Sequence, residues 1–192
     1  MTRLKGTKRK ILCTSIKLFK NKGFGSVSVK DICDASNITR STFYYHYDSK
    51  ESILDDYFVL PADIINDKIT EILSSTNSIE SFFVILNTFL DQIIDSGHDI
   101  IKQLFKRNID TNIRQFEPME IDLWEIYLNI LKKAKAEKRI KNKSPLNDLL
   151  KAYLYMSDGI ILVWCSSSGK VDLKEEQRKL FYTIFEIDDR DN

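Results

Sequence analysis

Apolar residues recur at three- and four-residue spacing along nearly the whole chain, and this pattern restricts the fold more than any other feature. No segment shows the sustained period of two that a half-buried strand requires. Six glycines and three prolines in 192 residues are also too few for a fold built on many tight turns. The sequence therefore predicts an all-α protein with about nine helices.

Cap residues give the approximate limits of these helices. Ser28, Thr39, Ser144 and Asp172 are predicted N-caps, and Gly23 and Asn37 can adopt the left-handed conformation that ends a helix. The predicted helices cover about 7–21, a short segment after Ser28, Thr39 to His46, a stretch from near Lys50 to Pro61, 79–95, 99–107, 118–139, 145–165 and 173–187.

Charge is distributed unevenly along the chain. Residues 1–50 carry eleven Lys and Arg against three Asp, a net charge of +8, whereas residues 51–192 carry a net charge of −7. A small basic unit next to a larger acidic one is expected to bind a polyanion with its basic part. We therefore predict two domains, residues 1–50 and residues 51–192. A basic surface without any partner is the alternative.

The sequence lacks the motifs that would indicate an enzyme, a metal protein or a membrane protein. The glycines near Gly23 lack the preceding strand and the third glycine of a dinucleotide motif. The three cysteines show no C-x-x-C spacing, and neither histidine lies near another metal-ligating His or Cys. No continuous apolar run comes near the ~20 residues of a membrane helix. We expect no catalytic residue, no cofactor and no metal, core positions for Cys13 and Cys33, and a cytoplasmic protein.

Residues 28–47 have the spacing of a helix-turn-helix, with two short helices separated by a tight break. The second helix of such a pair fits the major groove, so the start of its exposed face should be polar and small. Arg40, Ser41 and Thr42 stand at that start. Phe43 and Tyr47 are expected to face the core. Three consecutive rings, Tyr44, Tyr45 and His46, cannot all do so and are expected near DNA phosphates.

A set of spaced residues in the first 55 positions resembles the DNA-binding domain of the tetracycline-repressor (TetR) family of bacterial transcription regulators. The matching residues are Phe19, Lys22-Gly23-Phe24, Val27-Ser28-Val29, Asp31-Ile32, Ile38-Thr39-Arg40, Thr42 to Tyr47 and Ser49-Lys50-Glu51. The resemblance implies an N-terminal three-helix helix-turn-helix domain and a larger C-terminal helical domain for ligand binding and dimerisation. The chain departs from the family pattern at Asn37, which replaces a turn glycine.

The resemblance also implies roles for individual residues. Arg40, Ser41 and Thr42 are the expected base readers, and the expected phosphate contacts are Ser28, Thr39, Tyr44, Tyr45, His46 and Lys50. Lys50 has an independent reason, because a cation and free N–H groups at the start of a helix would form an anion site.

In the C-terminal domain, the resemblance implies a small-molecule pocket and a homodimer through the last two long helices. Aromatic residues suit an apolar pocket, and the candidate walls are Phe105, Phe116, Trp124, Tyr127 and Tyr155. The expected dimer residues have three- and four-residue spacing: Leu149, Tyr153, Met156, Ile160, Val163, Leu180, Ile184 and Ile187. These faces could instead pack within one chain.

The expected function is that of a ligand-responsive DNA-binding regulator, a repressor that a small molecule releases from a palindromic duplex operator. The resemblance implies that movement of the fourth helix changes the separation of the two recognition helices in the dimer. A ligand-independent or activating regulator that recruits a protein partner is the alternative, and a small-molecule enzyme is a remote one.

Overall fold

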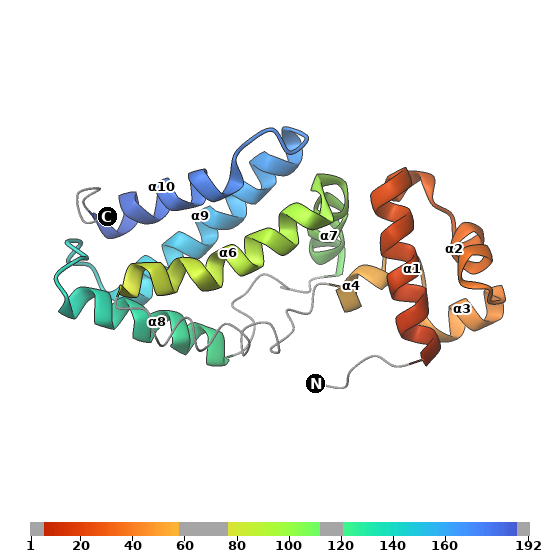
Figure 1. Cartoon of the computed structure of the whole chain (residues 1–192), viewed down its shortest axis with the longest axis horizontal. Helices are drawn as coiled ribbons and strands as arrows, with labels where there is room; N and C mark the ends of the chain where they lie inside the picture. Colours follow the sequence, from red (N-terminus) through yellow and green to blue (C-terminus); the bar gives the residue numbers. More distant parts are fainter. Residues whose placement is uncertain (1–5, 58–76, 112–120, 188–192) are drawn as a thin grey trace. The chain divides into compact units, whose positions relative to one another are not determined.

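The computed structural model describes residues 6–57, 77–111 and 121–187, and it confirms the all-α prediction (Figure 1). These residues form nine α-helices and one 3-10 helix and contain no strand. The elements are α1 (Gly6–Lys22), η1 (Phe24–Ser26), α2 (Val29–Ser36), α3 (Arg40–His46), α4 (Ile53–Tyr57), α6 (Ser78–Ser96), α7 (His98–Thr111), α8 (Ile121–Ala136), α9 (Leu146–Ser166) and α10 (Leu173–Phe185).

The chain divides into two compact units. Unit 1 takes residues 1–59 and 96–114, and unit 2 takes residues 60–95 and 115–192. Helix α7 therefore belongs to the same unit as α1 to α4, although it follows α6 directly in sequence. The functional division predicted at residue 50 stays a prediction.

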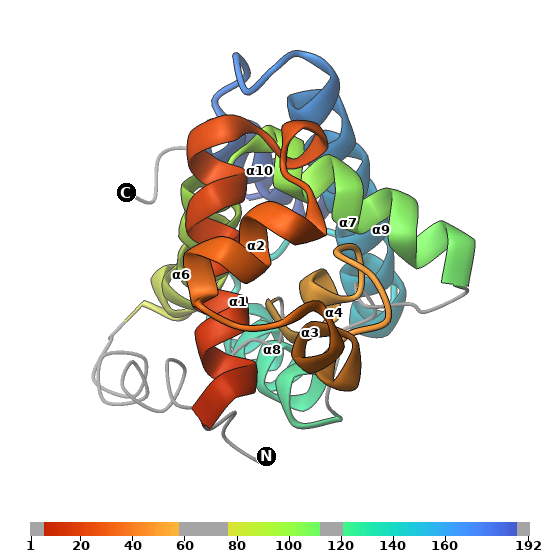
Figure 2. The same ribbon diagram turned by 90° about the vertical axis from the view of Figure 1, so that its right-hand side faces the viewer.

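Unit 1 is a small helical domain in which α1 packs against α2 (Figure 2). Its core contains Ile11 and Phe19 of α1, Ile32 of α2 and Phe43 of α3, all of them buried. The predicted break between α2 and α3 is confirmed, because Asn37 adopts a left-handed conformation with φ 48°. Asparagine tolerates this conformation better than most residues, so it can stand in place of a turn glycine.

Several predicted details of the helices were wrong. Helix α4 begins at Ile53 rather than near Lys50, and Pro145 rather than Ser144 takes the cap position of α9, without a side-chain bond. Helix α10 ends at Phe185 because Glu186 turns left-handed, with φ 52°. Cys13 is exposed, because the buried face of α1 runs through Ile11, Ser15, Ile16 and Phe19 instead.

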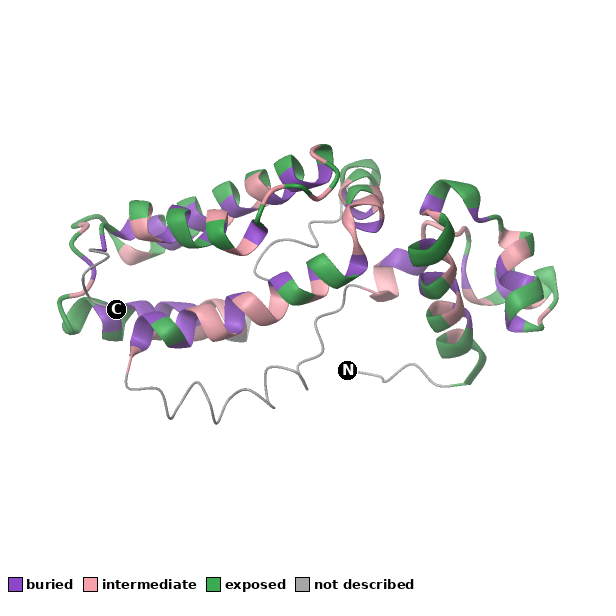
Figure 3. Ribbon diagram, turned by 45° about the horizontal axis from the view of Figure 1, so that its top comes forward, coloured by how far each residue is buried: buried purple, intermediate pink, exposed green. Residues whose placement is uncertain are grey.

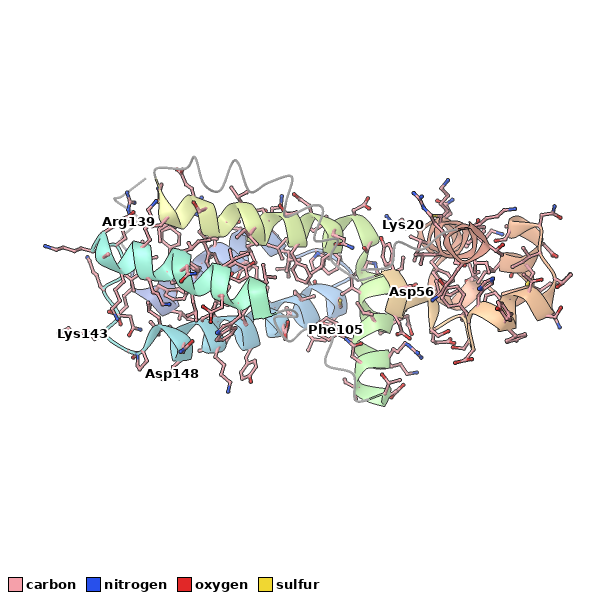
Figure 4. All side chains as sticks on the ribbon, turned by 90° about the horizontal axis from the view of Figure 1, so that it is seen from below. Lys20, Asp56, Phe105, Arg139, Lys143 and Asp148 are labelled. Atoms are coloured by element: carbon pink, nitrogen blue, oxygen red, sulfur yellow. The ribbon has the colours of Figure 1, made fainter. Side chains whose placement is uncertain are left out.

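Unit 2 is held together by aromatic side chains that fill the space between α6, α8, α9 and α10 (Figure 4). The Phe82 ring of α6 lies 4.7 Å from Tyr127, 5.6 Å from Tyr153 and 4.4 Å from Phe181, between ring centroids. One buried polar chain crosses this core. The Tyr153 hydroxyl donates to Gln177 Oε1 at 3.2 Å, and Gln177 Nε2 donates to the Ser157 carbonyl at 3.1 Å.

Helix α9 is the longest apolar helix in the described parts of the chain. By length and composition alone it could cross a membrane, and it is the single described helix that passes that test. Its Tyr153, Ile161 and Trp164 side chains are buried, however, and α9 packs along α10. One face of α9 therefore lies in the core of unit 2, and the rest of the helix is exposed or half-buried (Figure 3).

Candidate DNA-binding surface

The start of α3 presents a small polar surface. Thr39 caps the helix, because its hydroxyl oxygen accepts the Thr42 N–H at 3.1 Å. The same oxygen lies 2.8 Å from the hydroxyl oxygens of both Ser41 and Thr42. Arg40 and Ser41 are exposed, and Thr42 is half-exposed. The three predicted base readers therefore stand together at the accessible first turn, where short hydroxyls and a guanidinium can reach base edges.

The aromatic run that ends α3 is divided between core and surface as predicted. Phe43 and Tyr47 are buried, whereas Tyr44 is 54% exposed and Tyr45 is 84% exposed. His46 is half-buried, and its ring lies 4.9 Å from the Tyr45 ring. The exposed phenol hydroxyls can donate to phosphate oxygens without disturbing the core.

An open hollow of about 410 Å³ lies beside α3 in unit 1. It brings together three of the predicted phosphate contacts, Ser28, Tyr44 and Lys50, with the 25–29 backbone. Two carboxylates, Asp48 and Glu51, line the same hollow. The hollow is thus polar and of mixed charge, and its affinity for an anion depends on how the Lys50 ammonium is used.

Ser28 starts α2 through a reciprocal capping box. Its side chain accepts the Asp31 N–H at 3.2 Å, and the Asp31 carboxylate accepts the Ser28 N–H at 2.8 Å. The hydrogen bond from the Ser28 hydroxyl lowers the pKa of Asp31. The predicted cap is confirmed, and it fixes the direction in which α2 leaves η1.

The Lys50 ammonium points into the protein. Its Nζ donates to the backbone carbonyls of Phe24 and Val27, at 2.9 Å each, and lies 4.5 Å from the centre of the Phe24 ring. The turn that precedes α4 is closed instead by Ser49 and Ser52, whose hydroxyls accept each other's backbone N–H groups at 3.2 Å.

Sequence reasoning missed the bonds that attach α7 and α1 to the rest of unit 1. Asp99 accepts the Phe24 N–H at 2.8 Å, and Arg107 makes a two-pronged bond to Asp55, which raises the pKa of Arg107. Lys8 pairs with Asp56 of α4 at 2.7 Å. These partners lie 48 to 75 residues apart, so no local pattern in the sequence could have revealed them.

The predicted pocket residues occupy different environments. Tyr127 belongs to the aromatic core of unit 2, Trp124 is half-buried, and Tyr155 is exposed with Lys151 over its ring at 5.7 Å. Phe105 lies on α7 in unit 1, and Phe116 lies outside the described residues. The pocket therefore stays a prediction.

The predicted dimer residues fall into two groups. Leu149, Tyr153, Leu180 and Ile187 are buried within the chain itself. Met156 and Val163 are 53% and 55% exposed, and Ile160 and Ile184 are half-buried. Tyr155 and Leu162, which directly precede Met156 and Val163 on α9, are exposed as well. The described residues contain no group of three or more His, Cys, Asp or Glu that could hold a metal ion.

Comparison with known proteins gives this surface a context. Residues 11–57 match the profile of the bacterial regulatory proteins of the tetR family. The HTH-type transcriptional repressor KstR2 of Rhodococcus jostii is 28% identical over 126 residues, which are 62% of each protein. The HTH-type negative transcriptional regulator IcaR of the Staphylococcus aureus biofilm operon icaADBC is 33% identical over 87 residues, 45% of this chain and 47% of IcaR. The chain thus spans less than two thirds of either relative.

Solved structures share the fold along nearly the whole chain. Thermus thermophilus FadR, a TetR-family transcriptional repressor solved with lauroyl-CoA, has a TM-score of 0.64, with 19% identity and 92% of each chain covered. The fatty acid degradation regulator FadR of Bacillus halodurans has a TM-score of 0.61, with 16% identity over 95% of this chain and 97% of its own. The helix-turn-helix geometry and the capped α2 agree with the profile match, so residues 11–57 of this chain are similar to the DNA-binding segment of the bacterial regulatory proteins of the tetR family.

Proposed function

We propose that the protein is a sequence-specific, ligand-responsive transcription regulator, a repressor that leaves its DNA operator when a small molecule binds. The observation that carries this proposal is the exposed polar first turn of α3, where Arg40, Ser41 and Thr42 stand on a capped helix-turn-helix. The net charge of +8 on residues 1–50 supports a polyanionic partner. The protein works in the cytoplasm, where the operator is.

Binding-site selection from a random-sequence duplex library tests the reading face. We expect the unchanged protein to enrich a palindromic motif, and Arg40→Ala to change the preferred bases, because a lost bidentate base contact is worth about 1–3 kcal/mol. Tyr44→Phe is the matched control from the same helix. It removes one hydroxyl that suits a phosphate and should weaken all sequences alike. An identical motif for Arg40→Ala and the unchanged protein would contradict the assignment of base readers.

We propose that five of the six predicted phosphate contacts bind the DNA backbone: Ser28, Thr39, Tyr44, Tyr45 and His46. The sixth, Lys50, is not part of this set. The charge of residues 1–50 gives a separate test. A dimer presents this net charge of +8 twice, so affinity should fall by orders of magnitude between about 50 and 200 mM salt, because phosphates that Lys and Arg neutralise release counterions. A flat salt response in DNA anisotropy would contradict this part of the proposal.

We propose that the exposed apolar side chains of α9 pair with a second copy of the chain. Met156 and Val163 are the best supported of the predicted dimer residues, since they are exposed while their neighbours Tyr153 and Ile161 are buried. Val163→Glu should give monomers, because a charge on a buried seam has no partner there. Asn129→Glu, on the exposed face of α8, is the control and should stay dimeric. A dimeric Val163→Glu in sedimentation would place the interface elsewhere.

We propose that the effector site lies in unit 2, where Trp124, Tyr127 and Tyr155 are the predicted pocket residues that fall among the described residues. Thermal stabilisation by a panel of metabolites and drugs tests it, since a ligand at 100 times its dissociation constant adds about 2.7 kcal/mol. Acyl-CoA thioesters belong in the panel, because the FadR structure from Thermus thermophilus contains lauroyl-CoA. An effector should weaken operator binding some five- to 150-fold, and the operator should weaken effector binding by the same factor. A ligand that binds equally well with and without operator would remove the sensor from the proposal.

A further inference from the structure

The Phe24 peptide in η1 is held on both sides by charged side chains from distant parts of the chain. Its N–H donates to Asp99 of α7 at 2.8 Å, and its carbonyl accepts from Lys50 Nζ at 2.9 Å. The two partners are 75 and 26 residues away in sequence. The Phe24 side chain is buried, with its ring 4.6 Å from that of Phe19. A three-residue 3-10 helix has little cohesion of its own, so these bonds fix its position.

Lys50 uses most of its hydrogen-bonding capacity inside the protein. An ammonium has three donors, and two of them are bound to the carbonyls of Phe24 and Val27. The Phe24 ring lies beneath the same ammonium at 4.5 Å, which adds a cation–π attraction. To turn more than its third donor toward a phosphate, Lys50 would have to leave these carbonyls, which would lose their bond to the ammonium.

The surroundings of Lys50 also oppose an anion. Asp48 and Glu51 are its near neighbours in sequence, and both line the hollow that Lys50 lines. Like charges repel, so a phosphate that approached this hollow would meet two carboxylates together with a cation that is already bound. The exposed phenols of α3 are better placed for such a contact.

The bonds from Lys50 are made to the segment that directly precedes α2. Val27, the second carbonyl partner, directly precedes the Ser28 cap of α2, and α2 packs against α3. Gly23, before η1, has φ 80°, so the chain turns sharply there. The bonds to Phe24 and Val27 thus lie on the segment that joins α1 to the helix-turn-helix.

We propose that Lys50 and Asp99 are positioning residues for DNA reading, which clamp the Phe24 peptide and so hold α2 and α3 in the orientation that presents Arg40 to DNA. This inference rests on the proposed function. It gives Lys50 a role through the protein's own backbone, in place of the phosphate contact that the family resemblance implies.

Salt dependence separates the two roles of Lys50. The probe is the duplex that the unchanged protein enriches from a random library, and affinity is measured between about 50 and 200 mM salt. Loss of a phosphate contact makes the slope of log K against log salt shallower by about 0.9. For Lys50→Met we expect at least a tenfold weaker affinity with an unchanged slope. Lys50→Arg, which keeps several donors, should recover most of the affinity. Lys30→Met, which removes an exposed cation from α2, shows what the loss of a charge alone does.

Asp99→Ala removes a negative charge, whereas Lys50→Met removes a positive one, so the two variants separate charge effects from positioning. Removing a carboxylate makes unit 1 more basic, so Asp99→Ala should strengthen DNA binding if charge alone matters. The clamp predicts weaker binding instead. It also predicts that the losses for Asp99→Ala and Lys50→Met are not additive, because both act on the Phe24 peptide. All measurements are made at a temperature at which circular dichroism shows each variant to be folded. If Lys50→Met does not fold, Lys50→Arg and Asp99→Ala carry the test.

A slope shallower by about one for Lys50→Met, or tighter binding by Asp99→Ala, would overturn the inference and leave the proposed function intact. If the unchanged protein enriches no duplex at all, the proposed function fails first and the inference fails with it.

Discussion

Unit 1 and unit 2 are both helical, but different forces fix their helices. In unit 1, charged and polar side chains tie short elements together over long sequence distances, as Lys50, Asp99 and Arg107 do. In unit 2, closely packed, tilted rings such as Phe82, Phe181 and Phe185 fill the space between helices, with the shortest centroid distances at 4.4 Å.

This difference follows from the length of the helices. Short helices such as α2 and α3 bury little apolar area, so directional bonds must set the angle between them. Helices of 19 and 21 residues, α6 and α9, bury enough area for non-directional packing to hold them.

The largest effect is expected in the aromatic core of unit 2. Phe181 is fully buried, and its ring contacts those of Phe82, Tyr153 and Phe185. Phe181→Ala should cost about 3–5 kcal/mol of unfolding free energy, because it removes apolar contact and leaves a cavity. Denaturant titration measures the loss. A cost below about 1 kcal/mol would show that ring packing is not what holds unit 2.

A smaller loss of unfolding free energy is expected at the buried hydrogen bond between Tyr153 and Gln177 in unit 2. Gln177→Leu leaves the buried Tyr153 hydroxyl without its acceptor, and an unsatisfied buried group costs about 1–3 kcal/mol. The double variant Tyr153→Phe with Gln177→Leu removes both partners and should regain part of the loss. If the double variant is less stable than Gln177→Leu alone, the polar chain does not act as a pair in denaturant titration.

In unit 1, the cap of α2 should contribute about 1 kcal/mol, which is typical when an N-cap serine becomes alanine. Ser28→Ala removes the side-chain bond to the Asp31 N–H and should lower both the thermal midpoint and the operator affinity. Ser28→Thr, which keeps a capping hydroxyl, is the control and should retain most of both. Loss of stability without any loss of affinity would show that DNA binding does not depend on this cap.

The smallest expected effect is a pH-dependent gain in stability when a partly buried carboxylate in unit 2 is replaced. Burial raises the pKa of Asp158 on α9 from its usual 3.8 to about 6. The folded state then holds this proton more tightly than the unfolded state, so stability falls as pH rises from about 4 to 6 and stays lower above. Asp158→Asn should stabilise the protein at pH 8 and have little effect at pH 4. We expect a gain of about 1 kcal/mol or less, because water screens this half-exposed group.

Thermal midpoints at the two pH values measure this gain. Asp148→Asn, an exposed carboxylate on the same helix, is the control and should change little at either pH. Equal gains for Asp158→Asn at pH 4 and pH 8 would show that burial of the charge is not the cause.

Local features of the fold and the surface could be predicted from the sequence. The caps at Ser28, Thr39 and Asp172 and the left-handed Asn37 were all found where predicted, since each depends on residues within one helical turn. The division of the aromatic run, with Phe43 buried and Tyr45 exposed, follows from helical periodicity in the same way. The start of α4 was missed because the serine pair at 49 and 52 closes a turn where the pattern allows a helix.

The sequence by itself determined the helical class, the helix-turn-helix and the exposed polar start of α3, because periodicity, caps and charge act between near neighbours in the chain. Only the tertiary structure decided where charged side chains are used. The Lys50 ammonium lies on the carbonyls of Phe24 and Val27, and Asp99 brings α7 into unit 1. Such choices depend on which groups folding brings within hydrogen-bond distance across 23 to 75 residues, and directional bonds at that separation leave no periodic trace in the sequence.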